Sequence, residues 1–214
     1  MSDGSVLSSV QTVLRAYATS EATVTYIVIS LIAVVFLSEV LMTAFTSLGS
    51  IQVFATGLFG VHPTVAWPLS PVLHRGFRHF AASVFGLLVV GVPVEQHWSR
   101  TRYTAFLILT GYATIAAGAG VLWVLADQPV AFYGTSGVIY ALAGYSLTHL
   151  PRQHTTRSAI EAVAVVVGIL AFLSVVLDPF TGPYFAARWV NGGHISGFMI
   201  GAVVGWSNWS RCTR

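Results

Sequence analysis

The sequence has no lysine, one cysteine and few charged residues of either sign. Of its 214 residues only 8% are charged, whereas 55% are hydrophobic. Soluble domains carry about 25% charged residues, so this chain lacks the polar side chains that would cover a water-facing surface. Together with a mean hydropathy of +0.77, the composition excludes an ordinary soluble domain and predicts a surface that faces lipid.

The other scarcities exclude further classes of protein. The single cysteine, Cys212, rules out an intramolecular disulfide and a cysteine-based metal site. All ten basic residues are arginines, and they are scattered rather than clustered, so nothing indicates nucleic-acid binding despite a net charge of +3. No metal or organic cofactor is implied.

Long apolar segments predict an all-α membrane protein. A hydrocarbon core of about 30 Å takes roughly 20 helical residues. Five or six segments qualify, and we expect a bundle of six transmembrane helices. The clearest are 24–45, 103–126 and 159–177. Three more are interrupted by Gly, His or Ser near one end, namely 79–96, 136–150 and 191–209.

Charge and composition outside these segments predict the orientation. Six spans place seven arginines on one side and three on the other, which favours both termini in the cytoplasm. We expect residues 1–23 to be a short cytoplasmic tail, 24–209 the membrane domain and 210–214 a C-terminal cytoplasmic tail. The proline-rich connection 46–78 is expected to be a structured element in the membrane interface.

Polar residues lie at one depth on different predicted helices. Counting 14 residues from Leu150 back to Ser136 covers about 21 Å, and the same count leads from Asn208 to His194. His79 on the second span reaches a similar level. Intramembrane polar groups usually line a cavity or pair with each other, so these side chains predict a wet pocket inside the membrane.

The pocket's side chains are those of a hydrolase. A neutral imidazole that takes the proton of a hydroxyl makes it a nucleophile, and Ser136 with His194 supplies such a dyad. Tyr140, one turn below Ser136 on the same helix face, could support the imidazole. Gly134 and Gly137 bracket the serine where a helix begins, and amides at a helix start can stabilise an oxyanion. His79 and Ser83, one turn apart, could add donors.

Glycines on the last predicted helix recur every fourth residue. They are Gly193, Gly197, Gly201 and Gly205. Such small-xxx-small stripes let another membrane helix approach closely. Two of them, Gly201 and Gly205, fall on the His194 face, so we expect close helix contact beside the histidine.

Four stretches of the sequence resemble the rhomboid intramembrane serine proteases. They are GTSGVIYALAGY (134–145), NGGHISGFMIG (191–201), HFAAS (79–83) and the region of Glu95. The resemblance covers residues 79 to 209 in order. It implies Ser136 as nucleophile, His194 as its base, Tyr140 as the tyrosine four residues after the serine and His79 as an oxyanion donor.

Three positions depart from the family pattern. Ser83 stands where the family usually has Asn, and this shorter donor would reach the oxyanion through water, with a lower rate. Gly193 replaces the common Ala before the histidine. The Trp-Arg pair of the family's first loop is at best Trp67 followed by Pro68.

The resemblance implies a multi-pass protease of the cell membrane that cleaves single-span or other transmembrane proteins in or near their membrane helix. Helix-weakening residues near the scissile bond and a small residue before it are expected from the family. We expect the loop 178–190 to cap the site and to move with the fifth helix when a substrate enters. Neither the oligomeric state nor the native substrate is predicted.

Two other hypotheses stay open beside the protease. A non-catalytic relative would bind membrane clients through the same architecture. A transporter or channel would be expected to show charged pairs or broken helices in both halves, and the sequence has neither.

The remaining polar residues have ordinary interpretations. Glu39 is expected to be a helix-packing or interfacial carboxylate, with a loop contact as the alternative. Five histidines lie near predicted interfaces, where solvation would explain them: His62, His74, His97, His149 and His154.

Overall fold

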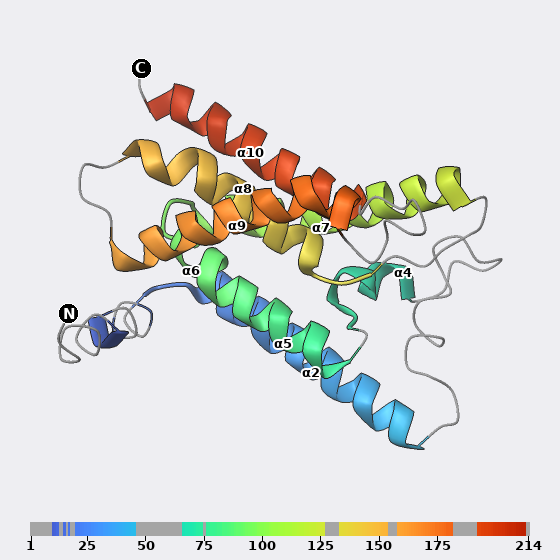
Figure 1. The fold of residues 1–214 in the computed structure, drawn as a ribbon. Coiled ribbons are helices and arrows are strands. Elements are labelled where there is room, and N and C mark those ends of the chain that lie inside the picture. The colour runs from blue at the N-terminus through green and yellow to red at the C-terminus, as the bar shows by residue number, and fades with distance from the viewer. Residues whose placement is uncertain are drawn as a thin grey trace.

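The described residues of the computed structural model are helical and contain no strand (Figure 1). Described are residues 10–12, 15, 17, 20–45, 66–74, 76–126, 133–153, 158–181 and 192–212. The expected all-α fold is confirmed for this part of the chain. His62, His154 and the loop 178–190 beyond residue 181 lie outside it.

The first half contains the first two expected spans and a short structured connection. Helix α2 is Thr23–Phe45, and the second span is continuous from Phe77 to Glu95 as α5 (Phe77–Gly86), the π-helical turn η2 (Leu87–Gly91) and α6 (Val92–Glu95). Before it come α4 (Ala66–Leu69) and the 3-10 helix η1 (Ser70–Val72). The connection is therefore structured at residues 66–72, as expected.

The second half consists of four long helices. They are α7 (Arg100–Ala126), α8 (Ser136–Gln153), α9 (Ala159–Thr181) and α10 (Gly192–Cys212). All six expected segments are thus helical. Four are long and apolar enough to cross a membrane: Thr23–Phe45, Phe77–Glu95, Arg100–Gly120 and Ala159–Leu177.

Helices α8 and α10 are not among those four because their sequences are less apolar. Their packing against other helices explains why they can contain more polar residues. Helix α8 has its most extensive contacts with α10 and further contacts with α9, and α10 also contacts α7. Neighbouring protein rather than lipid covers much of their surface, so Gly, Ser, Thr and His are tolerated there. Figure 1 shows α2 beside α5, with the start of α2 and the end of α10 at the same end of the molecule.

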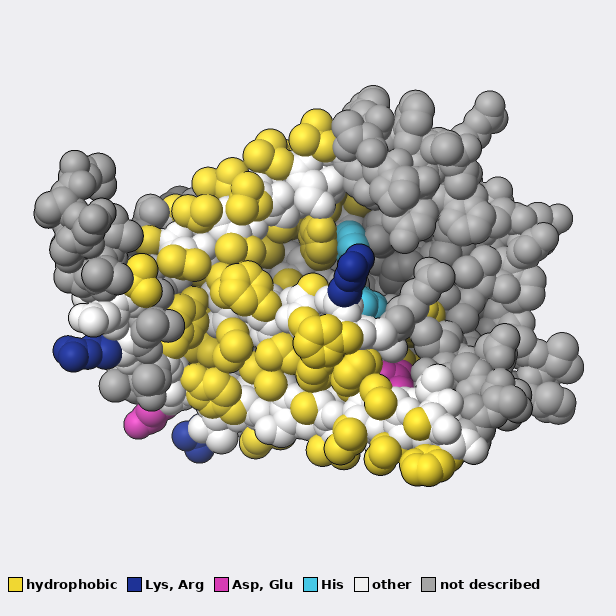
Figure 2. Space-filling model, turned by 60° about the horizontal axis from the view of Figure 1, so that its bottom comes forward, with side chains coloured by type: hydrophobic (Ala, Val, Ile, Leu, Met, Phe, Trp, Pro, Cys, Tyr) yellow, Lys and Arg dark blue, Asp and Glu magenta, His cyan; other side chains and the backbone are white. Residues whose placement is uncertain are grey.

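The outer helices turn large hydrophobic side chains outwards. On α2, Leu31, Val34 and Leu37 are 49%, 64% and 58% exposed, and α9 exposes residues such as Leu170 and Leu173. Figure 2 shows hydrophobic side chains gathered over much of the described part of one face. Water-soluble monomers rarely expose apolar patches of this extent, so this surface suits lipid.

Glycines set the distance between α8 and α10. A Cβ atom at Gly197 would overlap the carbonyl oxygen of Gly137, and one at Gly201 would overlap that of Ala141. One turn further on, a Cβ at Gly205 would lie 3.1 Å from the carbonyl oxygen of Tyr145. The expected close approach along the glycine stripe is therefore confirmed at three of its positions.

A buried carboxylate fixes the start of α2. Glu95, at the end of α6, accepts hydrogen bonds from the backbone N–H groups of Val24 and Thr25, both at 2.8 Å. Carboxylates stabilise helix N-termini because unpaired N–H groups and the helix dipole meet there. This contact joins the first span to the end of the second.

Candidate active site

Ser136 is the first residue of α8, and the chain enters that helix through a glycine-dependent turn. Gly134 has φ of 113°, a conformation that residues with a Cβ rarely adopt. Its N–H donates to the carbonyl of Ser70 at 2.8 Å. The Thr135 hydroxyl donates to the carbonyl of Pro71 at 2.9 Å. The residues just before Ser136 are thus bound to η1.

Ser136 and His194 are within hydrogen-bond distance although 58 positions separate them in the sequence. The Ser136 Oγ and His194 Nε2 atoms lie 3.0 Å apart. Helices α8 and α10 bring them together because the glycine contacts described above let the two backbones touch. Ser136 is the first residue of α8 and His194 the third of α10, so both side chains lie in the first turn of their helices.

Tyr140 lies one turn after Ser136 and contacts the same imidazole. Its ring stacks on that of His194, with centroids 4.1 Å apart and an interplanar angle of 10°. Its hydroxyl lies 2.7 Å from the Oγ of Ser174 on α9. The stacked ring restricts rotation of the imidazole, and the hydroxyl ties this pair to α9.

The imidazole of His79 lies against the turn that precedes Ser136. A Cβ atom built on Gly134 would come within 2.6 Å of His79 Cε1 and 3.0 Å of its Nε2. The glycine is therefore required both for its backbone conformation and for the room it leaves. The imidazole of His79 thus lies next to the turn that leads into α8, whose first turn has free N–H groups.

Ser83 follows His79 by one turn of α5 and is 1% exposed. No hydrogen-bond partner for its hydroxyl is found among the described residues. The structure therefore joins Ser83 to neither Ser136 nor His194 by a direct hydrogen bond. A buried hydroxyl without a protein partner is suited to binding a water molecule or a substrate atom.

The interpretation of the remaining histidines as solvated is wrong for His74 and His149, which are 1% and 2% exposed. His149 Nδ1 lies 3.3 Å from the carbonyl oxygen of Gly205. Burial, and secondarily the neighbouring His79, lower the pKa of His74 from 6.5 to about 4. The His74 ring is consequently neutral at pH 7.

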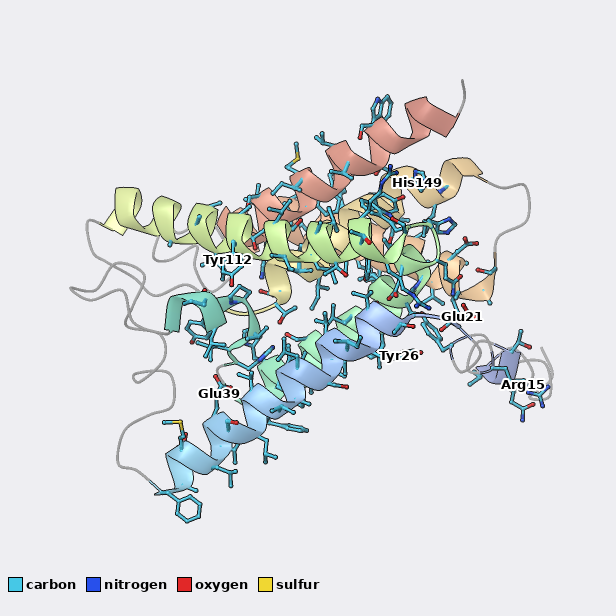
Figure 3. The ribbon with its side chains drawn as sticks, turned by 180° about the vertical axis from the view of Figure 1, so that it is seen from behind. Arg15, Glu21, Tyr26, Glu39, Tyr112 and His149 are labelled. Carbon is cyan, nitrogen blue, oxygen red and sulfur yellow. The ribbon has the colours of Figure 1, made fainter. Side chains whose placement is uncertain are left out.

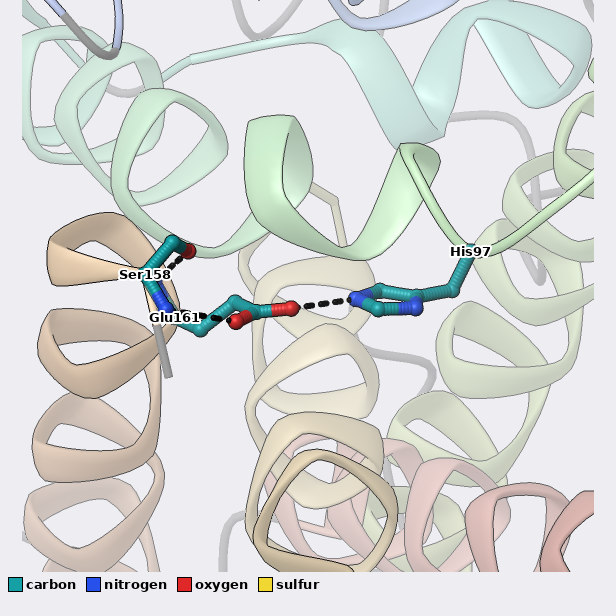
Figure 4. A network of polar contacts seen from close by, with 3 residues as sticks. All are labelled: His97, Ser158 and Glu161. Atoms are coloured by element: carbon teal, nitrogen blue, oxygen red, sulfur yellow. Dashed lines mark hydrogen bonds and ion pairs between the residues drawn. The ribbon is translucent and has the colours of Figure 1, made fainter. Parts of the chain in front are cut away.

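His97 is not simply solvated either, because it is bound to a carboxylate of α9. Its Nε2 lies 2.8 Å from Glu161 Oε1 (Figure 4). The other oxygen of Glu161 accepts from the backbone N–H of Ser158 at 3.0 Å. This network connects the turn after α6 to the start of α9.

Glu39 makes the loop contact that the sequence leaves as an alternative. It is 2% exposed, and the backbone N–H of His74 donates to its Oε1 at 3.1 Å and its Oε2 at 3.3 Å. Figure 3 shows Glu39 and Tyr112 on opposite sides of the segment that contains α4 and η1. The Tyr112 hydroxyl donates to the carbonyl of Pro68 at 2.7 Å, so α2 and α7 both hold this segment.

Fold and site together define a class, a helical multi-pass membrane protein with a serine and a histidine paired at the starts of two adjoining helices. A family model described as the Rhomboid domain matches residues 62–211. The chain belongs to the rhomboid family, which confirms the resemblance carried by its motifs.

Similar proteins include two from Arabidopsis thaliana. RHOMBOID-like protein 5 is 28% identical over 135 residues, which cover 62% of this chain and 40% of that protein. RHOMBOID-like protein 1 is 26% identical over 147 residues, which cover 67% of this chain and 36% of that protein. The chain therefore matches less than half the length of these relatives, and their likeness supports the family rather than a particular activity.

Proposed function

We propose that the protein is an intramembrane serine endopeptidase that cleaves transmembrane substrates through a Ser136–His194 dyad. The observation that carries the proposal is the 3.0 Å distance between Ser136 Oγ and His194 Nε2. The stacked ring of Tyr140 supports it further. Membership of the rhomboid family suggests the same chemistry.

In this mechanism Ser136 Oγ attacks the carbonyl carbon of the scissile peptide bond while His194 Nε2 takes the hydroxyl proton. The resulting imidazolium then donates that proton to the leaving amine as the carbon–nitrogen bond breaks. His194 next takes a proton from a water molecule, which attacks the acyl-enzyme. The second product leaves with a new carboxyl group, and the Ser136 hydroxyl is restored.

The oxyanion that forms in each step needs hydrogen-bond donors placed in advance. In the proposed site these are the backbone N–H of Ser136 and the imidazole of His79, which lies against Gly134. Ser83 contributes through a bound water, consistent with its buried hydroxyl and the absence of a described protein partner. Its short side chain in place of the family's usual Asn favours a slower enzyme.

We propose the membrane arrangement along with the activity. Helices α8 and α10 cross the membrane with the four apolar helices, both termini lie in the cytoplasm, and water enters from the outer side of the cell membrane. In support, the start of α2 and the end of α10 lie at one end of the molecule (Figure 1). The capping role of the loop 178–190 stays a prediction.

A second function is favoured by one observation. Ser83 replaces a side chain that normally supplies an oxyanion donor, which is compatible with a rhomboid-like protein that binds membrane clients without cleaving them. The two functions differ in one respect that is directly measurable, namely whether the reconstituted protein hydrolyses a substrate.

The test is a cleavage assay in lipid vesicles with a panel of single-span helices that contain Gly or Pro near the predicted scissile bond. We expect cleavage by the wild type, and none above background by Ser136→Ala or His194→Ala. The matched control is Ser146→Ala, because Ser146 is a second serine of α8, is buried, and donates to the carbonyl of Leu142 at 2.8 Å. Its activity should equal that of the wild type.

Two results would overturn the proposal. One is cleavage that persists in Ser136→Ala. The other is the absence of cleavage by a folded wild type across the panel together with retention of the helices, which would favour the client-binding function.

A further inference from the structure

A carboxyl group is buried in helix α2, which has no other charged residue, and the proposed catalytic steps do not use it. Glu39 is 2% exposed and receives the backbone N–H of His74. An ionisable residue in a membrane span is costly, and such residues usually have a functional role. A hydrophobic residue would be the cheaper choice there if helix packing were the only requirement.

The segment that Glu39 binds, residues 70–74, is also bound to the turn before Ser136. On that side Gly134 N–H donates to Ser70 O at 2.8 Å and Thr135 Oγ1 donates to Pro71 O at 2.9 Å. The segment 70–74 therefore connects α2 directly to the start of α8. Displacing it from α2 would release the attachment that Glu39 provides.

The same segment carries ring contacts to His79. The ring centroids of His74 and His79 lie 5.1 Å apart, and His74 meets Phe80 edge-on at 5.8 Å. Phe36, one turn before Glu39 on α2, stacks on Phe80 at 4.4 Å with an interplanar angle of 5°. One face of α2 is thus connected to His79 in two ways. Glu39 bonds the backbone of His74, whose ring contacts His79, and Phe36 stacks on Phe80, the residue next to His79.

We propose that Glu39 is a positioning residue for the oxyanion site: by holding the N–H of His74, it fixes the segment 70–74 and sets the place of His79 relative to Ser136. The inference rests on the proposed protease function. Glu39 touches no reacting atom, so it acts on the reaction only through His79 and the turn at Gly134.

The chain offers a matched control for this role. Glu95 is a second buried carboxyl group, 4% exposed, that joins α2 to another element through backbone N–H bonds. It binds Thr25, which lies 14 residues from Glu39 along α2, or about 21 Å. A substitution there should change stability without moving His79.

The experiment compares Glu39→Met, Glu39→Gln and Glu95→Met in lipid vesicles, measuring kcat, KM and Tm. Met fills similar space without an acceptor, whereas the Gln side-chain oxygen still accepts the His74 N–H. We expect Glu39→Met to lower kcat by about 10- to 100-fold with little change in KM, since loss of one oxyanion donor costs about 10² to 10³. Glu39→Gln should retain most of the activity, and Glu95→Met should keep its kcat whatever its Tm.

A second comparison separates positioning from stability. In a His79→Ala background, Glu39→Met should lower kcat no further, because residues that act as a unit are not additive. Thr135→Val, which removes a bond on the other side of the segment 70–74, should give the same kcat loss and provides an independent test if Glu39→Met folds poorly.

The inference is overturned if Glu39→Met lowers kcat by the same factor with and without His79, or if Glu95→Met lowers kcat as much as Glu39→Met. Failure of the protease function looks different, because the wild type itself would then show no Ser136-dependent cleavage. Wild-type cleavage together with an unchanged kcat in folded Glu39→Met would refute the positioning role alone.

Discussion

Replacing Gly201 with alanine should damage activity far more than the size of one methyl group suggests. A Cβ at this position would overlap the carbonyl oxygen of Ala141 and lie 2.8 Å from its Cα. Real Cβ atoms essentially never come within 3.0 Å of such neighbours. Both neighbours are backbone atoms, so no side chain can rotate away. Helices α8 and α10 would have to separate by roughly 1.5 Å, because packed interiors leave little free space.

The magnitude follows from two opposing terms. Overpacking costs about 1–3 kcal/mol, and alanine in place of a helical glycine returns up to about 1 kcal/mol. The net loss of stability is therefore about 0–3 kcal/mol. The Ser136–His194 distance starts at 3.0 Å, so even part of that separation exceeds the range of a hydrogen bond. A misplacement of this size costs about 100-fold in rate.

The assay is cleavage of a transmembrane substrate together with thermal unfolding. Gly120→Ala is the matched control, since Gly120 lies within α7 and a Cβ there would meet nothing within 4 Å. It should raise stability slightly and leave kcat/KM unchanged. Wild-type activity in Gly201→Ala would refute the reasoning that backbone contact between α8 and α10 sets the geometry of the dyad.

The remaining predictions concern two contacts, one beside the site and one between the turn after α6 and the start of α9. Tyr140→Phe keeps the ring stack on His194 but loses the bond to Ser174, so its kcat should stay near wild type while its stability falls by about 1 kcal/mol. Tyr140→Ala loses the stack as well and should lower kcat. Equal kcat values in the two variants would contradict this prediction. His97→Ala removes the 2.8 Å contact to Glu161 and should cost about 1.5–3 kcal/mol in the free energy of unfolding, measured by denaturation, with unchanged cleavage by the folded enzyme.

The helical segments and the proximity of Ser136 to His194 can be predicted from the sequence, because both stand out against their surroundings. Five or six apolar segments are visible from their length and composition, and Ser136 and His194 lie 14 residues from Leu150 and Asn208 in two of them. The glycine stripe indicated that these two helices touch. Each of these inferences depends on residues within one helix or on simple counting along it.

The contacts that sequence reasoning missed come from chain segments that fold back onto the bundle. Glu39 bonds the backbone of His74. Every residue except proline has a backbone N–H, so the sequence does not indicate which one a carboxylate will bind. His74 and His149 lie near the ends of predicted spans, where the sequence favours solvation, but Glu39 of α2 bonds the backbone of His74 and the carbonyl of Gly205 on α10 lies 3.3 Å from His149. The π-helical turn η2 inside the second span was not predicted, since periodicity gives no sign of one extra residue in a turn.

The most direct test of the central claim is to locate the adduct of a fluorophosphonate probe by peptide mass spectrometry on the protein in lipid vesicles. Such probes label a serine only when a base activates it. We predict one labelled serine, Ser136, with labelling lost in His194→Ala and retained in Ser146→Ala. Absence of label on a folded wild type, or labelling of Ser136 that persists without His194, would contradict it.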